Sequence, residues 1–227
     1  MSDYSALIVT LKLAFTTSVI LLFISLPLAW WLARPAKTRF GTKVRPIVEA
    51  LVALPLVLPP TVLGFYLLIA FSPDSWFGGS WFKLTGSNLA FSFSGLVIGS
   101  LFYSLPFVVQ PLQATFAAIP QSILEVSRSL GSTSIQQIKR VIFPLSKTGL
   151  ISAFSLGFAH TIGEFGVVLM IGGNIENETR VLSIAIYDHV ETLAFAQAHQ
   201  ISILLIAFSL ILLTLLYRFK HNRVGIK

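Results

Sequence analysis

Apolar and polar positions divide this chain into long uncharged segments and short segments that carry most of its charge. Four of the apolar segments have about 20 residues or more, enough to cross the ~30 Å hydrocarbon core of a bilayer as a helix, and a fifth is shorter but apolar throughout. The pattern therefore predicts an all-α, polytopic integral membrane protein with a single transmembrane domain over residues 1–227. The predicted spans cover roughly residues 13–33, 47–71, 89–112, 145–171 and 201–217.

Composition supports a membrane protein and limits the available chemistry. Hydrophobic residues make up 55% of the 227 residues, charged residues make up 11%, and the mean hydropathy is +0.82. A soluble domain of this size cannot bury so much apolar surface. The chain has no cysteine, which excludes disulfides, thiol catalysis and cysteine metal ligands.

The formal charge of +7 is compatible with nucleic-acid binding, but its distribution indicates membrane topology instead. Basic residues gather after the first and third spans and at the C-terminus, whereas most acids lie on the other side. By the positive-inside rule, the basic side is cytoplasmic and the N-terminus lies outside. No nucleic-acid partner is expected. The basic residues on the predicted cytoplasmic side are Arg34, Lys37, Arg39, Lys43, Arg45, Arg128, Lys139, Arg140, Lys147, Arg218, Lys220, Arg223 and Lys227.

Residues 120–144 form a polar, basic stretch between two apolar segments, and they predict two short amphipathic helices with a glycine break. Ser122 and Glu125 have the S-x-x-E spacing of a capping box, and Ser134 and Gln137 repeat it. Gly131 lies between them, where a left-handed residue would end the first helix. We expect a helix–turn–helix on the cytoplasmic side with one face toward a partner.

The second span contains three prolines, Pro55, Pro59 and Pro60, followed by Thr61. Because each proline removes a backbone donor, the sequence predicts a broken or strongly bent helix. Irregular backbone at membrane depth survives only where it is buried in protein or lines a cavity. These residues are therefore candidates for a transport path, and a simple packing kink is the alternative.

The fourth span contains Glu164, the one acidic residue well inside a predicted span, among glycines that include Gly163 and Gly166. Thr161 adds a hydroxyl, and His160 is placed to share a helix face with Glu164 at i, i+4. Ionisable groups at membrane depth are functional candidates by default. No third ligand is evident, so no metal site is expected, and no catalytic residues are assigned.

The stretch 120–144 resembles the cytoplasmic EAA loop of ABC importer permeases, which reads E-A-A-x3-G-x9-I-x-L-P. Glu125, Gly131 and Pro144 match this pattern in register. The resemblance implies a type I importer permease fold and a loop that docks into a cleft on an ATPase subunit. Val126 and Ser127 stand in place of the two alanines, and Val141 and Phe143 in place of the isoleucine and leucine.

Two further stretches resemble oxyanion permeases. LPLVLPPTVLG, residues 54–64, is similar to the second span of molybdate permeases. Residues 163–187 are similar to a run in molybdate and sulfate permeases that reads roughly GEFGA, G-N-I, E-T-x and L-P-x-A-I-Y. Here Val167 replaces the alanine and Ser183 the proline. The resemblance places Glu164 and its glycines at an external gate, with the segment after them facing a binding protein.

The expected function is the permease subunit of an ATP-driven importer for molybdate, with tungstate as a close chemical alternative. The chain has no G-x-x-x-x-G-K-[ST] loop, so ATP and Mg²⁺ are expected on a separate ATPase subunit and no cofactor on this chain. A carboxylate repels an anion, so Glu164 is interpreted as a gate or structural hydrogen bond rather than a ligand. The expected assembly is a homodimer with two ATPase subunits and an extracytoplasmic oxyanion-binding protein, in the inner membrane.

Three alternatives remain open. A sulfate or thiosulfate permease shares the motifs, although the short chain favours molybdate. An ion-coupled secondary transporter would need inverted repeats and further deep charges, and a membrane enzyme would need a third polar group beside His160 and Glu164. The candidates for the path and gate are Pro55, Pro59, Pro60, Thr61, Thr161, Gly163, Glu164 and Gly166.

Overall fold

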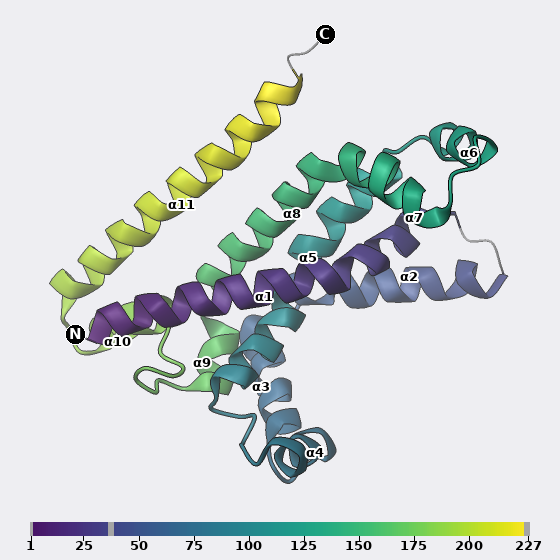
Figure 1. Ribbon diagram of the computed structural model, residues 1–227. Helices are drawn as coiled ribbons and strands as arrows, with labels where there is room; N and C mark the ends of the chain where they lie inside the picture. Colours follow the sequence, from purple (N-terminus) through teal and green to yellow (C-terminus); the bar gives the residue numbers. More distant parts are fainter. Residues whose placement is uncertain (1, 36–38, 225–227) are drawn as a thin grey trace.

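The computed structural model describes residues 2–35 and 39–224, and within these residues the chain is helical with no strand. Figure 1 shows long helices lying across one another, with shorter helices at both ends of the bundle. The helices are α1 (Ser2–Ala33), α2 (Arg39–Ala53), η1 (Leu54–Leu56), α3 (Pro60–Phe71), α4 (Trp76–Thr85), α5 (Phe93–Ala117), α6 (Gln121–Ser129), α7 (Ser134–Gln137), the π-helical turn η2 (Ile138–Ile142), α8 (Phe143–Ile162), α9 (Gly166–Gly172), α10 (Leu182–Glu191) and α11 (Phe195–Val224).

Four of the described helices are long and apolar enough to cross a membrane, and a bent pair raises the number to five. The four are Asp3–Ala33, Phe93–Ala117, Ser134–Ile162 and Phe195–Arg218. The bent pair is Gly41–Val57 with Pro60–Phe71, at an angle of 111°. The all-α, polytopic class is therefore confirmed, as is the break at the prolines of the second span.

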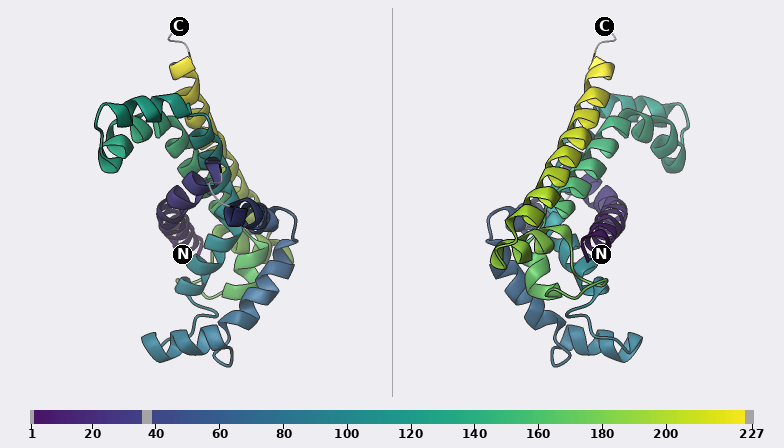
Figure 2. Two further views of the ribbon diagram at one scale, coloured as in Figure 1. Left: turned by 90° about the vertical axis from the view of Figure 1, so that its right-hand side faces the viewer. Right: turned by 90° about the vertical axis from the view of Figure 1, so that its left-hand side faces the viewer.

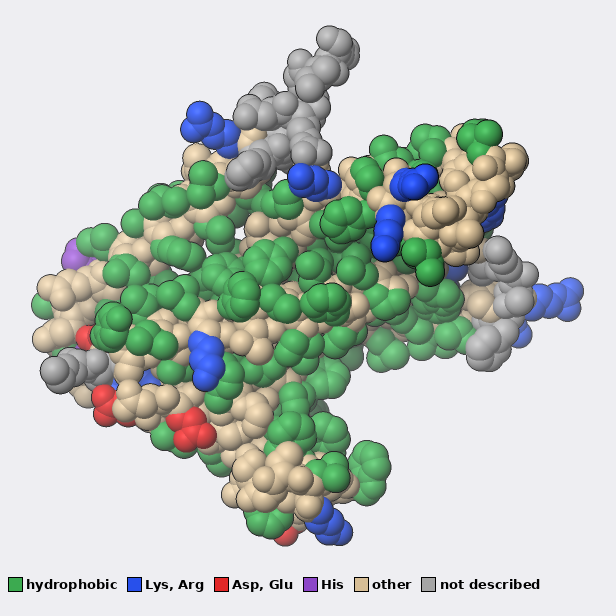
Figure 3. All heavy atoms as spheres, viewed as in Figure 1, with side chains coloured by type: hydrophobic (Ala, Val, Ile, Leu, Met, Phe, Trp, Pro, Cys, Tyr) green, Lys and Arg blue, Asp and Glu red, His purple; other side chains and the backbone are tan. Residues whose placement is uncertain are grey.

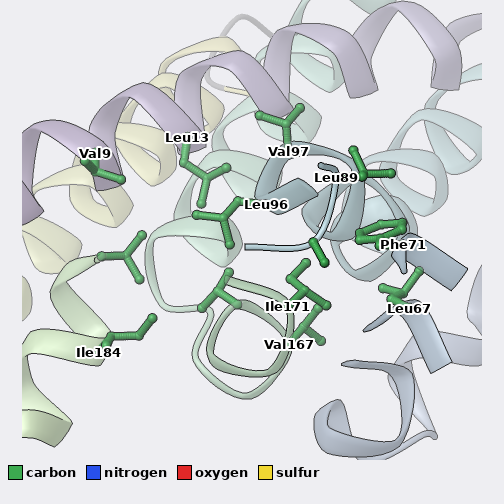
Figure 4. Packing of buried hydrophobic residues seen from close by; sticks show 13 residues of the cluster. Val9, Leu13, Leu67, Phe71, Leu89, Leu96, Val97, Val167, Ile171 and Ile184 are labelled. Atoms are coloured by element: carbon green, nitrogen blue, oxygen red, sulfur yellow. The ribbon is translucent and has the colours of Figure 1, made fainter. Parts of the chain in front are cut away.

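Helices α1, α5 and α8 form the centre of the bundle (Figure 1). Small residues let them approach closely: a Cβ on Gly157 would lie 2.5 Å from Val108, and one on Gly149 2.0 Å from the Thr115 hydroxyl oxygen. At one end of the bundle, Leu96 of α5 points toward Val167 and Ile171 of α9 (Figure 4). The short helix α9 is thereby packed into the core.

The continuous span predicted over residues 145–171 is wrong in two respects. Helix α8 ends at Ile162, and the chain breaks at residues 163–165 before α9 begins. At its other end the helix continues back through η2 to Ser134, so the second helix of the 120–144 stretch and the fourth span form one continuous helical segment. Pro144 explains the π-helical turn, because proline has no N–H for the carbonyl four residues earlier, and a wider turn relieves the clash of its ring. The Phe143 N–H bonds instead to the Ile138 carbonyl.

The connection between the second and third spans, residues 72–88, contains a helix, α4. The Ser75 hydroxyl caps it by accepting from the Gly78 N–H at 2.8 Å, and Gly86 ends it at φ +73°. Figure 2 shows α4 projecting from one end of the molecule and α6 with α7 projecting from the other. These two projections mark opposite ends of the bundle.

The two ends also differ in charge. In Figure 3 the blue Lys and Arg side chains gather at the end that carries α6, α7 and the end of α11. The red Asp and Glu side chains gather near the N-terminus and α4. Helix α10, at the acidic end, carries Asp188 and Glu191. The charge separation in the sequence is therefore also a separation in space.

Candidate functional site

The segment from α6 to α8 projects at the basic end of the molecule (Figure 2). Helix α6 ends before Gly131, which has φ +78° as predicted. The capping box predicted at Ser122 and Glu125 is wrong, because α6 begins directly after Pro120 and has no side-chain cap. The second box forms one residue earlier than predicted, between Thr133 and Gln136.

One face of α6 packs against the rest of the molecule, and the other face is exposed. The Gln137 side chain donates to the Leu124 carbonyl at 2.7 Å, and Leu124 and Ser127 are buried. Val126 and Leu130 are exposed, Leu130 to 80%. Exposed apolar side chains on a projecting helix are typical of a protein-binding surface.

Four of the predicted coupling residues, Glu125, Val126, Gly131 and Pro144, are exposed on this segment, and Ser127 is buried beneath it. Their contact with an ATPase stays a prediction. Here the sequence identified the segment, and the structure adds which face is available.

The two broken spans meet at the opposite end of the bundle. A cavity of about 530 Å³ lies where α3 and α9 begin. A Cβ on Gly166 would lie 2.8 Å from Cβ of Pro60, so the two breaks are in close contact. The residues that line the cavity are Pro60, Thr61, Tyr103, Ala159, His160, Gly163, Glu164, Phe165 and Gly166.

Five of the eight predicted path residues therefore come together: Pro60, Thr61, Gly163, Glu164 and Gly166. The other three lie apart from this cavity. Pro55 is in η1 and Pro59 directly precedes α3, whereas the Thr161 hydroxyl donates to the Gly157 carbonyl of its own helix at 2.9 Å. The transport role of all eight stays a prediction.

Glu164 is held in the second break by two serines from other helices. The Ser100 hydroxyl of α5 donates to carboxylate Oε2 at 2.8 Å, and the Ser183 hydroxyl of α10 donates to the Glu164 carbonyl oxygen at 2.6 Å. The side chain is only 3% exposed, and its Oε1 has no partner among the described residues. The structural hydrogen bond expected for Glu164 is present, and a gating role stays a prediction.

His160 does not pair with Glu164, so that expectation is wrong. The helix ends at Ile162, which removes the i, i+4 register on which the pairing depended. The His160 ring stacks on Phe107, with centroids 3.7 Å apart, and its Nδ1 lies 2.9 Å from the Ser104 hydroxyl. Within the described residues, no group of three His, Cys, Asp or Glu side chains could hold a metal ion.

Ser100 and Ser104 were missed by the sequence analysis. They lie one helical turn apart on α5 and are both fully buried, and each bonds to the fourth span. The available signal was the S-x-x-x-S spacing in an otherwise apolar helix, which puts two hydroxyls on one face. Ser100 bonds to Glu164 in the break, and Ser104 bonds to His160 and Thr161 in the last turn of α8, so both hydroxyls pair with polar groups in the protein interior.

Helix α10 is attached to the same break. Besides the Ser183 bond, the Tyr187 ring packs on Phe165 with centroids 5.1 Å apart. The Leu182 N–H also donates to the Thr10 hydroxyl of α1 at 2.8 Å. Displacement of this short helix would therefore act directly on residues 163–165.

Together these features define a class: a polytopic membrane protein in which two discontinuous helices meet at a cavity that contains an ionisable side chain, as in transporters. Solved importers share the fold. A methionine ABC transporter, MetNI, in an inward-facing conformation matches 97% of this chain and 95% of its own with a TM-score of 0.71 at 16% identity. A bacterial alginate ABC transporter, in complex with its alginate-bound periplasmic protein, matches 99% of this chain and 80% of its own with a TM-score of 0.77 at 15% identity.

Residues 25–224 match the sequence profile of a family described as the binding-protein-dependent transport system inner membrane component. The chain belongs to this family, and its fold is that of type I ABC importer permeases. The molybdenum transport system permease protein ModB of Azotobacter vinelandii is 48% identical over 99% of this chain and 97% of its own length. The sulfate transport system permease protein CysT of Escherichia coli is 32% identical over 96% and 78%.

Proposed function

We propose that this chain is the membrane-spanning subunit of an ATP-driven importer for molybdate. The observation that carries the proposal is the 48% identity to a molybdenum permease over nearly the whole of both chains. Tungstate is chemically close enough to use the same path. Sulfate is the second candidate, supported by relatives that are 32% identical and extend beyond the region matched.

The cavity at the two breaks suits a path that does not hold its anion tightly. Its lining has no Lys or Arg, and its hydroxyl and aromatic groups include Thr61 and Tyr103. Helix α3 begins at the cavity with Pro60, and helix N-termini carry free backbone N–H groups that favour anions. Selectivity then rests largely on a separate binding protein, and the permease exposes its path to each side in turn.

In this mechanism Glu164 belongs to the gate rather than to the anion site. Ser100 and Ser183 tie its side chain and backbone to α5 and α10. Movement of α10 would strain both bonds and open the contact between Gly166 and Pro60. The breaks supply the freedom for that movement, because neither helix is continuous through the cavity.

The proposed orientation puts the basic end in the cytoplasm, with the N-terminus outside and the C-terminus inside. In the structure, α6 and α7 project at that basic end (Figure 3), where a cytoplasmic ATPase could reach them. Five spans are few to enclose a path, so the proposed assembly is a homodimer with one ATPase subunit on each copy. ATP and Mg²⁺ would bind to those subunits, with no cofactor on this chain, and the binding protein would dock at the acidic end.

Uptake into proteoliposomes tests the proposal. The vesicles would hold the permease with its ATPase, binding protein would be added outside, and labelled molybdate would be followed with ATP or ADP inside. We expect ATP-dependent uptake that tungstate blocks and sulfate does not. ATP-dependent uptake blocked by sulfate would assign the chain to sulfate, and uptake driven by an ion gradient without ATP would overturn the importer.

A further inference from the structure

A second cavity, of about 490 Å³, lies at the basic end of the bundle. Its walls come from the end of α1, the end of α5, the segment α6–η2 and the start of α8. Most of the lining is apolar, including Leu26, Ile142 and Leu150. The cavity is separate from the site at the two broken spans, and the proposed transport cycle assigns it no role.

One guanidinium group without a counterion lines this cavity, and a second lies against one of its lining residues. Arg128 of α6 is part of the lining, and Arg34 follows the last residue of α1. Arg34 lies 4.3 Å over the ring of Trp30, another lining residue, and donates to the carbonyls of Phe116 and Ile119 at 3.1 and 3.3 Å. Among the described residues, no carboxylate lies within 4 Å of either guanidinium.

The surroundings of Arg34 reflect this excess of positive charge. Burial lowers the pKa of Arg34, and the nearby charge of Arg128 lowers it further. Like charges are normally kept apart or neutralised. An anion between the two guanidiniums would remove their repulsion and accept hydrogen bonds from both.

A third polar group points to the same ligand. Ser146 of α8 lines the cavity and is 1% exposed, and its hydroxyl has no partner in the described part of the chain. Buried hydroxyls normally have a partner. The cavity therefore combines an unpaired buried donor and two unpaired cations with an apolar wall.

We propose that this cavity binds one acidic phospholipid of the cytoplasmic leaflet, with its phosphate between Arg34 and Arg128 and an acyl chain along the apolar wall. The cavity lies at a suitable depth for a lipid headgroup, because Arg34 follows the end of the α1 span and Trp30 lies one turn inside that span. Trp and Arg are typical of the interface between headgroups and hydrocarbon. A free oxyanion would leave the apolar wall uncovered. A zwitterionic lipid has no net charge, because its ammonium group balances its phosphate, and it would leave both cations without net compensation.

Such a lipid would link the α6 segment to the rest of the bundle. Arg128 belongs to α6, whereas Arg34 follows α1, and a shared phosphate would bridge them. The lipid site does not depend on the transported substrate, and its leaflet follows from the proposed orientation. Acidic lipid is therefore expected at one specific place on this chain.

Fluorescence quenching by brominated lipids tests this place directly, because Trp30 lines the cavity and the neighbouring Trp31 does not. A single-tryptophan chain retains Trp30, with Phe at Trp31, Trp76 and Trp81. The full chain is placed in nanodiscs with equal low fractions of brominated phosphatidylglycerol or brominated phosphatidylcholine. We expect stronger quenching by the phosphatidylglycerol, and Arg128→Gln should raise the half-quenching fraction about tenfold, as for loss of a charged hydrogen bond.

The matched control is a chain that retains only Trp31. The guanidinium of Arg45 lies 5.4 Å from the centre of the Trp31 ring. Quenching of Trp31 therefore measures acidic lipid that gathers non-specifically around basic residues. Arg140→Gln, an exposed position outside the cavity, controls for loss of charge. Equal headgroup preference at both tryptophans, or equal effects of the Arg128 and Arg140 variants, would overturn the proposal.

A second measurement uses the assembled permease–ATPase complex and does not depend on tryptophan. Native mass spectrometry of the complex released from nanodiscs should show retained phosphatidylglycerol, and Ser146→Ile, which fills the cavity without altering charge, should reduce it. Retention by the permease alone but not by the complex would mean that the ATPase occupies the cavity, and the proposal would be wrong.

Discussion

Two of the segments that interrupt helices in this protein are held in place in opposite ways. At the basic end, the turn at Gly131 is held locally: it depends on one left-handed residue and the adjacent Thr133–Gln136 box, and nothing lies within 4 Å of a Cβ on Gly131. At the acidic end, residues 163–166 are held by Ser100 and Ser183, which are distant in sequence. The first break depends on backbone conformation and the second on tertiary contacts.

The largest effect is expected from Gly166→Val, which acts on the tertiary break. A Cβ at this position would lie 2.8 Å from Cβ of Pro60, and overpacking of this kind costs about 1–3 kcal/mol. Because the added side chain separates the break of the fourth span from the break of the second span at Pro60, we expect ATP-dependent molybdate uptake to fall more than about tenfold. The uptake assay described above measures this.

Gly163→Ala is the matched control for that variant. It lies in the same break, but its φ is −84° and the nearest atoms to an added Cβ are carbonyl oxygens 3.8 and 3.9 Å away. We expect near-normal uptake. If Gly163→Ala were as damaging as Gly166→Val, flexibility of the break rather than its contact with Pro60 would be the important property.

Gly131→Val tests the locally held break. Left-handed backbone costs a residue with a Cβ about 1–2 kcal/mol, and the cost is greater for a β-branched residue. We expect the complex to assemble and hydrolyse ATP. The amount of molybdate imported per ATP hydrolysed should fall about fivefold or more. The measurement is uptake and phosphate release in the same vesicles.

Gly86→Val provides the control, because Gly86 has nearly the same conformation at the opposite end. Its φ is +73°, and nothing lies within 4 Å of an added Cβ. It therefore carries the same backbone penalty without touching the α6 segment. Coupled uptake that is equally impaired in both variants would contradict a coupling role for residues 120–144.

Replacement of Glu164 separates hydrogen bonding from charge. Gln preserves the acceptor for the Ser100 hydroxyl, so we expect uptake by the Glu164→Gln variant to fall less than about threefold. Glu164→Ala leaves the buried Ser100 hydroxyl without a partner, which costs about 1–3 kcal/mol. We expect uptake by this variant to fall about tenfold. Complete loss of uptake in the Gln variant, in a normally assembled complex, would mean that the negative charge is required.

The difference between the two breaks also explains what the sequence could predict. The break in the second span and the left-handed Gly131 follow from proline and glycine alone, because their effect on the backbone is local. The same holds for the all-α class and the number of spans, which follow from segment length and hydropathy. The first predicted capping box is absent because α6 begins after Pro120 without a side-chain cap. The second was predicted one residue too late because Thr133 and Gln136 compete with Ser134 and Gln137 for the helix start.

The polar contacts of the second break could not be predicted in this way. Nothing near Glu164 in sequence indicates Ser100 or Ser183, and the His160 pairing failed because it assumed a helix that continues to residue 164. Hydroxyls from other helices satisfied the buried groups instead. A local pattern identifies the residue that needs a partner, but the packing of three helices decides which partner it finds.

The smallest effect is expected from Ser183→Ala, which removes the bond between α10 and the Glu164 carbonyl. Loss of one such bond is worth about 0.5–1.5 kcal/mol, so we expect basal ATPase activity to be unchanged and its stimulation by the binding protein to fall about two- to threefold. Ser183→Thr keeps the hydroxyl and should restore stimulation.

Ser202→Ala, which removes a hydroxyl bonded at 2.7 Å to a carbonyl within α11, is the control. Equal losses in the Ser183→Ala and Ser202→Ala variants would mean that α10 does not transmit binding-protein docking to the break, and that the Ser183 bond only stabilises the fold.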